Sequence, residues 1–163
     1  MKAMLLVSAM LATASVANAA DIKAERIGDA WRIRIAGDIE PGDHRKFLRA
    51  IEGPWSYYWP VYLTSRGGDL ITGLAIGAQI RAHGMSTVAD GACASVCGLI
   101  WLGGVVRAAI EGSHIGFHAA YYGESKGVTS DGNAVVGAYL RELGFSFDAI
   151  RFFTYAPLIR WNG

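Results

Sequence analysis

The chain has 163 residues, 52% of them hydrophobic, and its 15 lysine and arginine residues nearly balance its 14 aspartate and glutamate residues. This length is typical of a single domain. A formal net charge of +1 gives no electrostatic reason to expect nucleic acid or an anionic membrane surface as a partner.

The first 19 residues have the pattern of a secretory signal peptide. Lys2 is the positive start, Met4–Ala14 is the apolar run, and Ala17-Asn18-Ala19 provides the small residues of a cleavage site. A buried amino-terminal helix is the alternative, and the run is shorter than the about 20 apolar residues that span a membrane. We therefore expect export to the periplasm or beyond, cleavage after Ala19, and a mature domain of residues 20–163.

Apolar periodicity and turn residues divide the mature domain into alternating strands and helices. This alternation predicts an α/β domain with a mainly parallel sheet. In chain order we expect a strand at 31–36, a helix at 43–52, a strand at 61–64, a helix at 69–83, a strand at 86–89, a helix at 94–102, strands at 105–110 and 114–118, a loop at 121–132, and helices at 134–143 and 147–153.

The two cysteines, Cys93 and Cys97, are four residues apart. On a helix this spacing puts the Cα atoms roughly 6 Å apart, which a disulfide permits, and an exported protein can keep such a bond. Two buried thiols fit the spacing equally well. No second cysteine or histidine pair completes a zinc site, because His114 and His118 lie in a strand-like stretch. We expect no metal.

Three small motifs follow expected strands. Gly67-Gly68 lies between a strand and a helix, where glycine allows a positive φ and close approach of the backbone to a ligand. Ser95 begins an apolar helix, and His118 ends a strand. Alone, each has an ordinary explanation: a tight turn, a helix N-cap or a histidine at a strand end. Because ligands bind beyond the carboxyl ends of parallel strands, the three together predict a site with a nucleophile and a base.

These motifs carry a specific resemblance. The segment from Thr64 to Gly77 resembles the paired-glycine segment of the proteolytic subunit of the Clp protease, Cys93-Ala-Ser-Val-Cys-Gly98 resembles its nucleophile segment, and Ile115-Gly-Phe-His118 resembles its histidine segment. The similarity is closer to exported bacterial Clp-like proteins and extends from about Trp31 to the end of the chain.

The resemblance implies a ClpP/crotonase-type fold, in which ββα units stack around a mainly parallel sheet. It also implies a serine peptidase with Ser95 as the nucleophile and His118 as the general base. The backbone N–H groups of Gly68 and Val96 would form the oxyanion hole. Arg66 stands where the family usually has proline, which should alter the turn but leave these donors.

The third member of the triad departs from the family pattern. The family places an aspartate after the penultimate helix, whereas residues 152–160 contain no carboxylate. Asp148, on the last expected helix, and Asp131, in the loop after His118, are the nearest acids. The chain also ends at Gly163, earlier than this fold implies, which is the pattern of a carboxyl-terminal truncation.

We therefore expect a serine-type peptidase that hydrolyses peptides or unfolded proteins through an acyl-enzyme on Ser95, without a metal or organic cofactor. Homo-oligomers are expected because family members form rings. The alternative is a catalytically impaired Clp-like module that binds peptides, which the missing acid favours. A crotonase-type enzyme acting on acyl-CoA is a third interpretation, and export argues against it because CoA esters are cytoplasmic.

Overall fold

The structure is a computed structural model that describes residues 19–54, 56–122 and 127–155. β1 pairs antiparallel with β2, and the other pairs of the main sheet are parallel. The prediction of an α/β domain with a mainly parallel sheet is therefore confirmed. The sheet consists of β1 (Asp21–Ile27), β2 (Ala30–Ala36), β3 (Val61–Ser65), β4 (Thr87–Ala94), β5 (Arg107–Ala109) and β6 (His114–Gly116), with β5 and β6 sharing one edge of β4.

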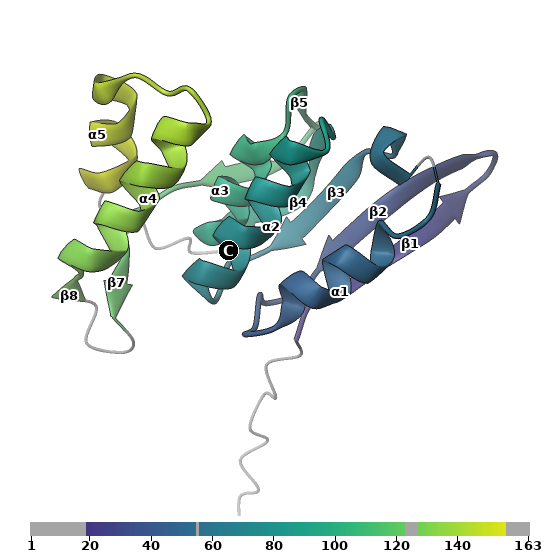
Figure 1. Ribbon diagram of the computed structural model, residues 1–163, viewed down its shortest axis with the longest axis horizontal. Coiled ribbons are helices and arrows are strands. Elements are labelled where there is room, and N and C mark those ends of the chain that lie inside the picture. Colours follow the sequence, from purple (N-terminus) through teal and green to yellow (C-terminus); the bar gives the residue numbers. More distant parts are fainter. Residues whose placement is uncertain (1–18, 55, 123–126, 156–163) are drawn as a thin grey trace, which may run out of the picture.

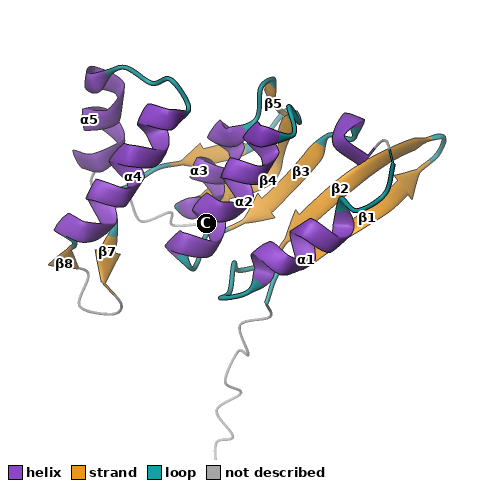
Figure 2. Ribbon diagram, in the orientation of Figure 1, coloured by secondary structure: helices purple, strands orange, loops and turns teal. Residues whose placement is uncertain are grey.

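Three helices connect the parallel strands and lie on one face of the sheet (Figures 1 and 2). They are α1 (Asp43–Ala50), α2 (Leu70–Ala82) and α3 (Val96–Gly103), and a short 3-10 helix, η1 (Ser56–Tyr58), precedes β3. Strands β2 to β5 follow one another in space as they do in sequence. Successive right-handed crossovers in one direction bring every helix to the same side.

The core lies between this helical layer and the sheet. On β2 and β3 alternate residues are fully buried, and they pack with buried residues of the helices, such as Phe47 of α1 and Ile80 of α2. The opposite face of the sheet carries Arg32 and Tyr62, which are partly exposed. The guanidinium of Arg32 lies 4.6 Å from the centroid of the Tyr62 ring. This alternation matches a sheet with one buried and one solvated face.

The remaining elements lie at the end of the molecule farthest from the β1–β2 hairpin (Figure 1). They are the two-stranded pair β7 (Tyr121–Tyr122) and β8 (Gly127–Val128), followed by α4 (Ser130–Glu142) and α5 (Phe147–Tyr155). Tyr139 of α4 is buried and donates a hydrogen bond of 2.9 Å to the Leu99 carbonyl. This bond ties α4 to α3.

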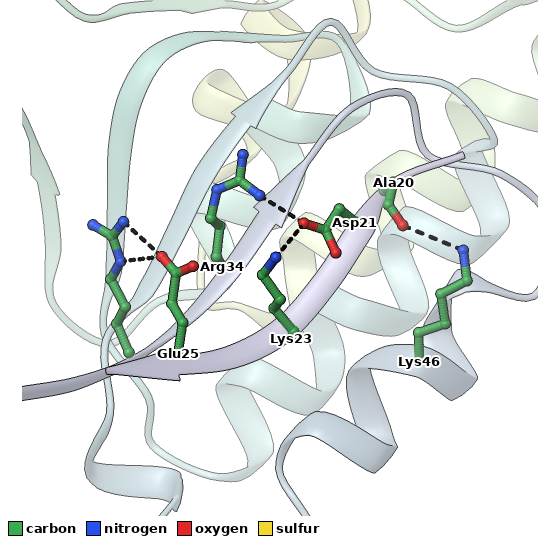
Figure 3. Close-up of polar contacts among 7 residues, drawn as sticks. Ala20, Asp21, Lys23, Glu25, Arg34 and Lys46 are labelled. Carbon is green, nitrogen blue, oxygen red and sulfur yellow. Dashed lines mark hydrogen bonds and ion pairs between the residues drawn. The ribbon is translucent and has the colours of Figure 1, made fainter. Parts of the chain in front are cut away.

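Strand β1 was not predicted, because its outward-facing residues are charged rather than apolar. Figure 3 shows these charges paired on the sheet face: the Asp21 carboxylate lies 2.8 Å from both the Lys23 ammonium and the Arg34 guanidinium. The Arg32 guanidinium lies 2.6 Å from Glu25. The hydrogen bond from Lys23, with the charges of Lys23 and Arg34, lowers the pKa of Asp21.

Several predicted boundaries were wrong. The strand expected at 86–89 continues to Ala94, because its second half pairs with Ser65 and with β6. The helix expected from Ala94 therefore begins at Val96, and the strand expected at 105–110 is only Arg107–Ala109. The expected loop contains β7, β8 and the start of α4, whose first turn is capped where the Thr129 hydroxyl accepts a hydrogen bond from the Gly132 N–H at 3.2 Å.

The predicted signal peptide, residues 1–19, lies outside the described residues except for Ala19, and residues 156–163, next to the predicted truncation, lie outside them as well. The first described residues are held by the domain. Ala19 forms an isolated parallel bridge with Asp38. Ala20 is 2% exposed, and its carbonyl accepts a hydrogen bond of 3.2 Å from the Lys46 ammonium (Figure 3). Within the described ranges, no helix combines the length and the apolar character needed to cross a bilayer.

Candidate active site

Three neighbouring strands end in register at one edge of the sheet. Ser65 of β3 is opposite Cys93 of β4, and Cys93 and Ala94 are opposite Ile115 and Gly116 of β6. The segments that follow these strands therefore leave the sheet side by side. They meet in a cavity of about 590 Å³ whose lining includes Gly68, Ser95, Val96 and His118. The structure brings together all four residues predicted for the catalytic machinery.

Ser95 lies at the junction of β4 and α3 in an unusual backbone conformation. Its φ of 60° and ψ of −130° belong to a region that glycine favours. Among the described residues it is the single non-glycine residue with a positive φ. Such a conformation costs about 1–3 kcal/mol and persists only where surrounding contacts enforce it. The Ser95 side chain makes no capping hydrogen bond to α3, so the N-cap interpretation does not account for it.

The glycine pair packs directly against the serine. Gly67 has a φ of 114°, and a Cβ placed on it would lie 2.6 Å from the Ser95 Cβ and 3.0 Å from the Ser95 Oγ. A Cβ on Gly68, whose φ is 136°, would overlap the Ile39 carbonyl oxygen. Both positions therefore need glycine for their backbone angles and for the space around them.

The Gly68 N–H has no hydrogen-bond partner among the described residues. The Gly67 carbonyl accepts a hydrogen bond from the Ile39 N–H, and the Asp69 N–H donates to the Ile39 carbonyl, both at 2.7 Å. Because successive groups of an extended segment alternate in direction, the Gly68 N–H between them faces the other side, where Gly68 lines the cavity.

The Val96 N–H is the second donor at the cavity. Val96 is the first residue of α3, and the first N–H groups of a helix have no partner within the helix. The positive end of the helix dipole also favours negative charge at this point. Gly68 and Val96 therefore offer the two backbone donors that an oxyanion requires.

His118 is held in one orientation by its neighbours. Its Nδ1 lies 2.8 Å from the Ala119 carbonyl oxygen. A carbonyl only accepts hydrogen bonds, so the neutral ring carries its hydrogen on Nδ1 and keeps a lone pair on Nε2. The Tyr121 ring lies against the imidazole with centroids 4.9 Å apart. No hydrogen bond joins His118 to Ser95 within the described part of the chain.

Neither predicted acid contacts the histidine. Asp131 lines the same cavity, but its carboxylate is contacted at 3.4 Å by the Ser130 hydroxyl. Asp148 is exposed on α5, away from the cavity lining. Asp69 accepts a hydrogen bond of 2.8 Å from the Thr72 N–H and so caps α2. The acceptor that orients His118 is a backbone carbonyl.

The rest of the cavity is mainly apolar. Leu99 and Val136 form part of its wall and are buried, whereas Ile71 is 61% exposed. Arg66 lies beside the glycine pair, and its guanidinium is 3.0 Å from the Asp38 carboxylate. This ion pair is exposed and contributes at most about 1 kcal/mol, so Arg66 places a weakly held cation beside the cavity.

The two cysteines form a disulfide across the serine. Cys93 closes β4, Cys97 lies in the first turn of α3, and the Cα atoms are 5.1 Å apart. Both residues are fully buried. Of the two alternatives that their spacing left open, the structure contains the bond.

Sequence reasoning missed three contributors to this site. Ser65 is buried, and its hydroxyl accepts a hydrogen bond of 3.1 Å from the Gly67 N–H. Ile39 pairs with the glycine turn, and Tyr121 contacts His118. Ser65 lies two residues before Gly67 and is the one that local sequence could have indicated. Ile39 and Tyr121 reach the site only through tertiary contacts.

No metal site is evident in the described ranges: no three His, Cys, Asp or Glu side chains there are grouped as metal ligands would be. No protein-family model matches the chain, and no curated protein matches it as a relative. The functional conclusion therefore rests on the geometry of the site and on the motif resemblance.

Proposed function

We propose that this protein is an exported serine peptidase of the Clp-like group, with the ClpP/crotonase type of fold. The observation that carries the proposal is Ser95, a strained serine that shares one cavity with His118, Gly68 and Val96. The backbone N–H groups of Gly68 and Val96 have no partner among the described residues. Strain of this kind clusters at functional sites. The one-sided helical layer over sequentially ordered parallel strands supports the fold assignment.

In the proposed reaction, the Ser95 Oγ attacks the carbonyl carbon of a peptide bond while the His118 Nε2 takes the hydroxyl proton. The carbonyl oxygen becomes an anion and accepts hydrogen bonds from the Gly68 and Val96 N–H groups. The C–N bond then breaks, and the leaving amine takes the proton from His118. His118 then takes a proton from a water molecule, whose oxygen attacks the acyl carbon of the resulting ester. The bond to the Ser95 Oγ breaks, the carboxylic acid product leaves, and His118 returns the proton to Ser95.

Two features of the site set the expected rate. The Ala119 carbonyl fixes the reactive tautomer of His118, but it lacks the negative charge that stabilises an imidazolium. The Ser95–His118 hydrogen bond has to form in the substrate complex, as often happens with catalytic hydrogen bonds that are long in the free enzyme. We therefore expect a slower peptidase than one with a complete triad.

The substrate is proposed to be a short peptide or an unfolded protein. The apolar wall formed by Leu99 and Val136 suits an aliphatic or aromatic side chain beside the scissile bond, because burial of apolar surface favours binding. The proposed location is the periplasm or the exterior, which the amino-terminal pattern and the disulfide support.

A second candidate is a Clp-like module that binds peptides without cleaving them. It is favoured by the absence of a Ser95–His118 hydrogen bond and of a carboxylate on His118 within the described residues. Such a module would use the same cavity and the same backbone donors. It differs from the enzyme in one property, the reactivity of the Ser95 hydroxyl.

Hydrolysis of fluorogenic peptides by the mature chain tests the proposal. We expect Ser95→Ala and His118→Ala each to abolish measurable cleavage. Ser86→Ala, directly before β4, and His83→Ala, at the exposed residue that follows α2, are matched controls that should cleave at the wild-type rate. Cleavage that survives Ser95→Ala would exclude this mechanism. Wild-type protein that binds peptides without cleaving them would favour the binding module.

A further inference from the structure

We propose that the Cys93–Cys97 disulfide positions the nucleophile: it holds the Ser95 backbone in its strained conformation, and loss of the bond lowers the reactivity of the hydroxyl. The second half of this statement rests on the proposed function. The first half concerns backbone geometry alone and holds for either candidate function.

The bond closes a short loop that contains the serine. Only Ala94, Ser95 and Val96 lie between the two half-cystines. These residues supply the nucleophilic Oγ and one of the two oxyanion donors. A constraint on this short segment therefore acts on both parts of the machinery at once.

The two anchors of the bond are held independently of each other. Cys93 is paired on both sides, with Ser65 of β3 and Ile115 of β6. Cys97 is fully buried in α3, a helix that packs against α2. The disulfide thus connects two rigid parts of the structure, and the turn that carries Ser95 is the segment between them.

Within the described part of the chain, two backbone hydrogen bonds hold Ser95 besides the disulfide. Its N–H donates to the Gly116 carbonyl at 2.9 Å, and its carbonyl accepts from the Gly98 N–H at 3.0 Å. A residue in a disfavoured conformation relaxes when the surrounding structure no longer enforces it. Without the disulfide, hydrogen bonds alone would hold the serine in a backbone conformation that a serine disfavours. The disulfide adds a covalent constraint to these bonds.

A general stabilising role explains the bond less well. The stabilisation that a disulfide gives by restricting the unfolded chain grows with the length of the loop it closes, and this bond closes a loop of sequence separation four. Its main effect is therefore expected on local geometry. A dithiol would reduce it to two thiols with two electrons and two protons, and would itself become a disulfide.

Reduction has a definite consequence for the turn, whereas alanine at either cysteine removes the covalent constraint without adding volume. Two unbonded sulfur atoms need more room than a disulfide, and Cys93 and Cys97 are both 0% exposed. A close-packed interior gives little room for such a change. The displacement therefore falls on the turn at Ser95, which moves the hydroxyl relative to His118 and the Val96 N–H relative to the substrate.

The test compares wild type with Cys93→Ala, Cys97→Ala and the double variant. One readout is the rate at which a fluorophosphonate labels Ser95, and the other is amide hydrogen exchange at Ser95 and Gly98. We expect labelling to fall on the order of 100-fold, the effect of a misplacement of about 1 Å, and both amides to exchange faster. Each single variant should match the double, because either one removes the same bond.

Two controls separate positioning from lost packing. Ile80→Val removes a buried methylene from α2 far from the cavity lining and should leave labelling unchanged while lowering the melting temperature. The Thr87 N–H, bonded to the Val106 carbonyl at the other end of β4, should keep its exchange rate in every cysteine variant.

Failure of this inference is distinguishable from failure of the proposed function. If wild-type protein is not labelled at all, the peptidase proposal fails, and hydrogen exchange alone decides the role of the bond. Wild-type exchange rates at Ser95 and Gly98 in the double variant would overturn the positioning role. Labelling of the double variant at the wild-type rate would overturn the link to reactivity.

Discussion

Replacing Ser95 by glycine should stabilise the fold while removing the nucleophile. Alanine at this position keeps a Cβ in the disfavoured backbone region, whereas glycine does not. Relief of this strain contributes about 1–3 kcal/mol, and the greater freedom of glycine in the unfolded chain costs about 0.4–1 kcal/mol. Ser95→Gly should therefore exceed Ser95→Ala in stability by about 1 kcal/mol, and by about 2.6 kcal/mol at most.

Urea unfolding of the two variants measures this difference directly, since the absence of the hydroxyl is common to both. A domain of this size should show a rise in melting temperature of about 2–4 °C for each kcal/mol. The slope of the unfolding free energy against urea should be equal for the two variants, because the surface exposed on unfolding is nearly the same in both. A Ser95→Gly variant less stable than Ser95→Ala would refute the view that Ser95 is strained.

Three further predictions follow from the same structure. Gly67→Ala should lose both stability and Ser95 labelling, because the new Cβ would overlap the Ser95 side chain. The control Gly28→Ala, at a φ of 61° with no atom within 4 Å, should lose about 1 kcal/mol of stability and no labelling. Equal labelling of the two variants would contradict this prediction. Burial raises the pKa of the Tyr139 hydroxyl, so the folded state keeps the proton that the unfolded chain releases above about pH 10. Stability should therefore fall by about 1.4 kcal/mol per pH unit above pH 10, and urea unfolding from pH 9 to 11 should show that Tyr139→Phe removes this part of the slope. Mass spectrometry of the exported protein should find a chain that begins directly after Ala19, and a chain that retains residue 1 would contradict the signal peptide.

The parts of the fold that the sequence predicted are those in which apolar residues define a buried face. β2 and β3 alternate between buried apolar residues and more exposed ones, and both strands were predicted. β1 was not predicted, because ion pairs such as Asp21–Arg34, rather than apolar contacts, cover its outer face. The second half of β4 was not predicted, because a glycine such as Gly91 usually indicates the end of a strand. In the structure the segment after Gly91 still pairs on both sides.

The candidate site was predicted to a similar extent and for a different reason. The residue types of the candidate site pointed to a nucleophile, a base and a tight turn: Ser95, His118 and the glycine pair. Because each follows a strand, the sequence predicted that they would meet at one edge of the sheet. The partner of His118 could not be predicted, because the Ala119 acceptor is a backbone carbonyl and carries no signal in residue type. Tyr121 was placed in a loop and reaches His118 only in the folded chain.

Fluorophosphonate labelling of the mature wild-type protein, located by peptide mapping, tests the central claim most directly. The probe reacts with an activated serine hydroxyl and forms a stable phosphonyl adduct. We predict one adduct per chain, on Ser95, at a rate that Ser86→Ala leaves unchanged and His118→Ala reduces by at least about two orders of magnitude, as expected for loss of a general base. Wild-type protein without an adduct on Ser95, or with the same labelling rate after His118→Ala, would contradict the proposed nucleophile and base.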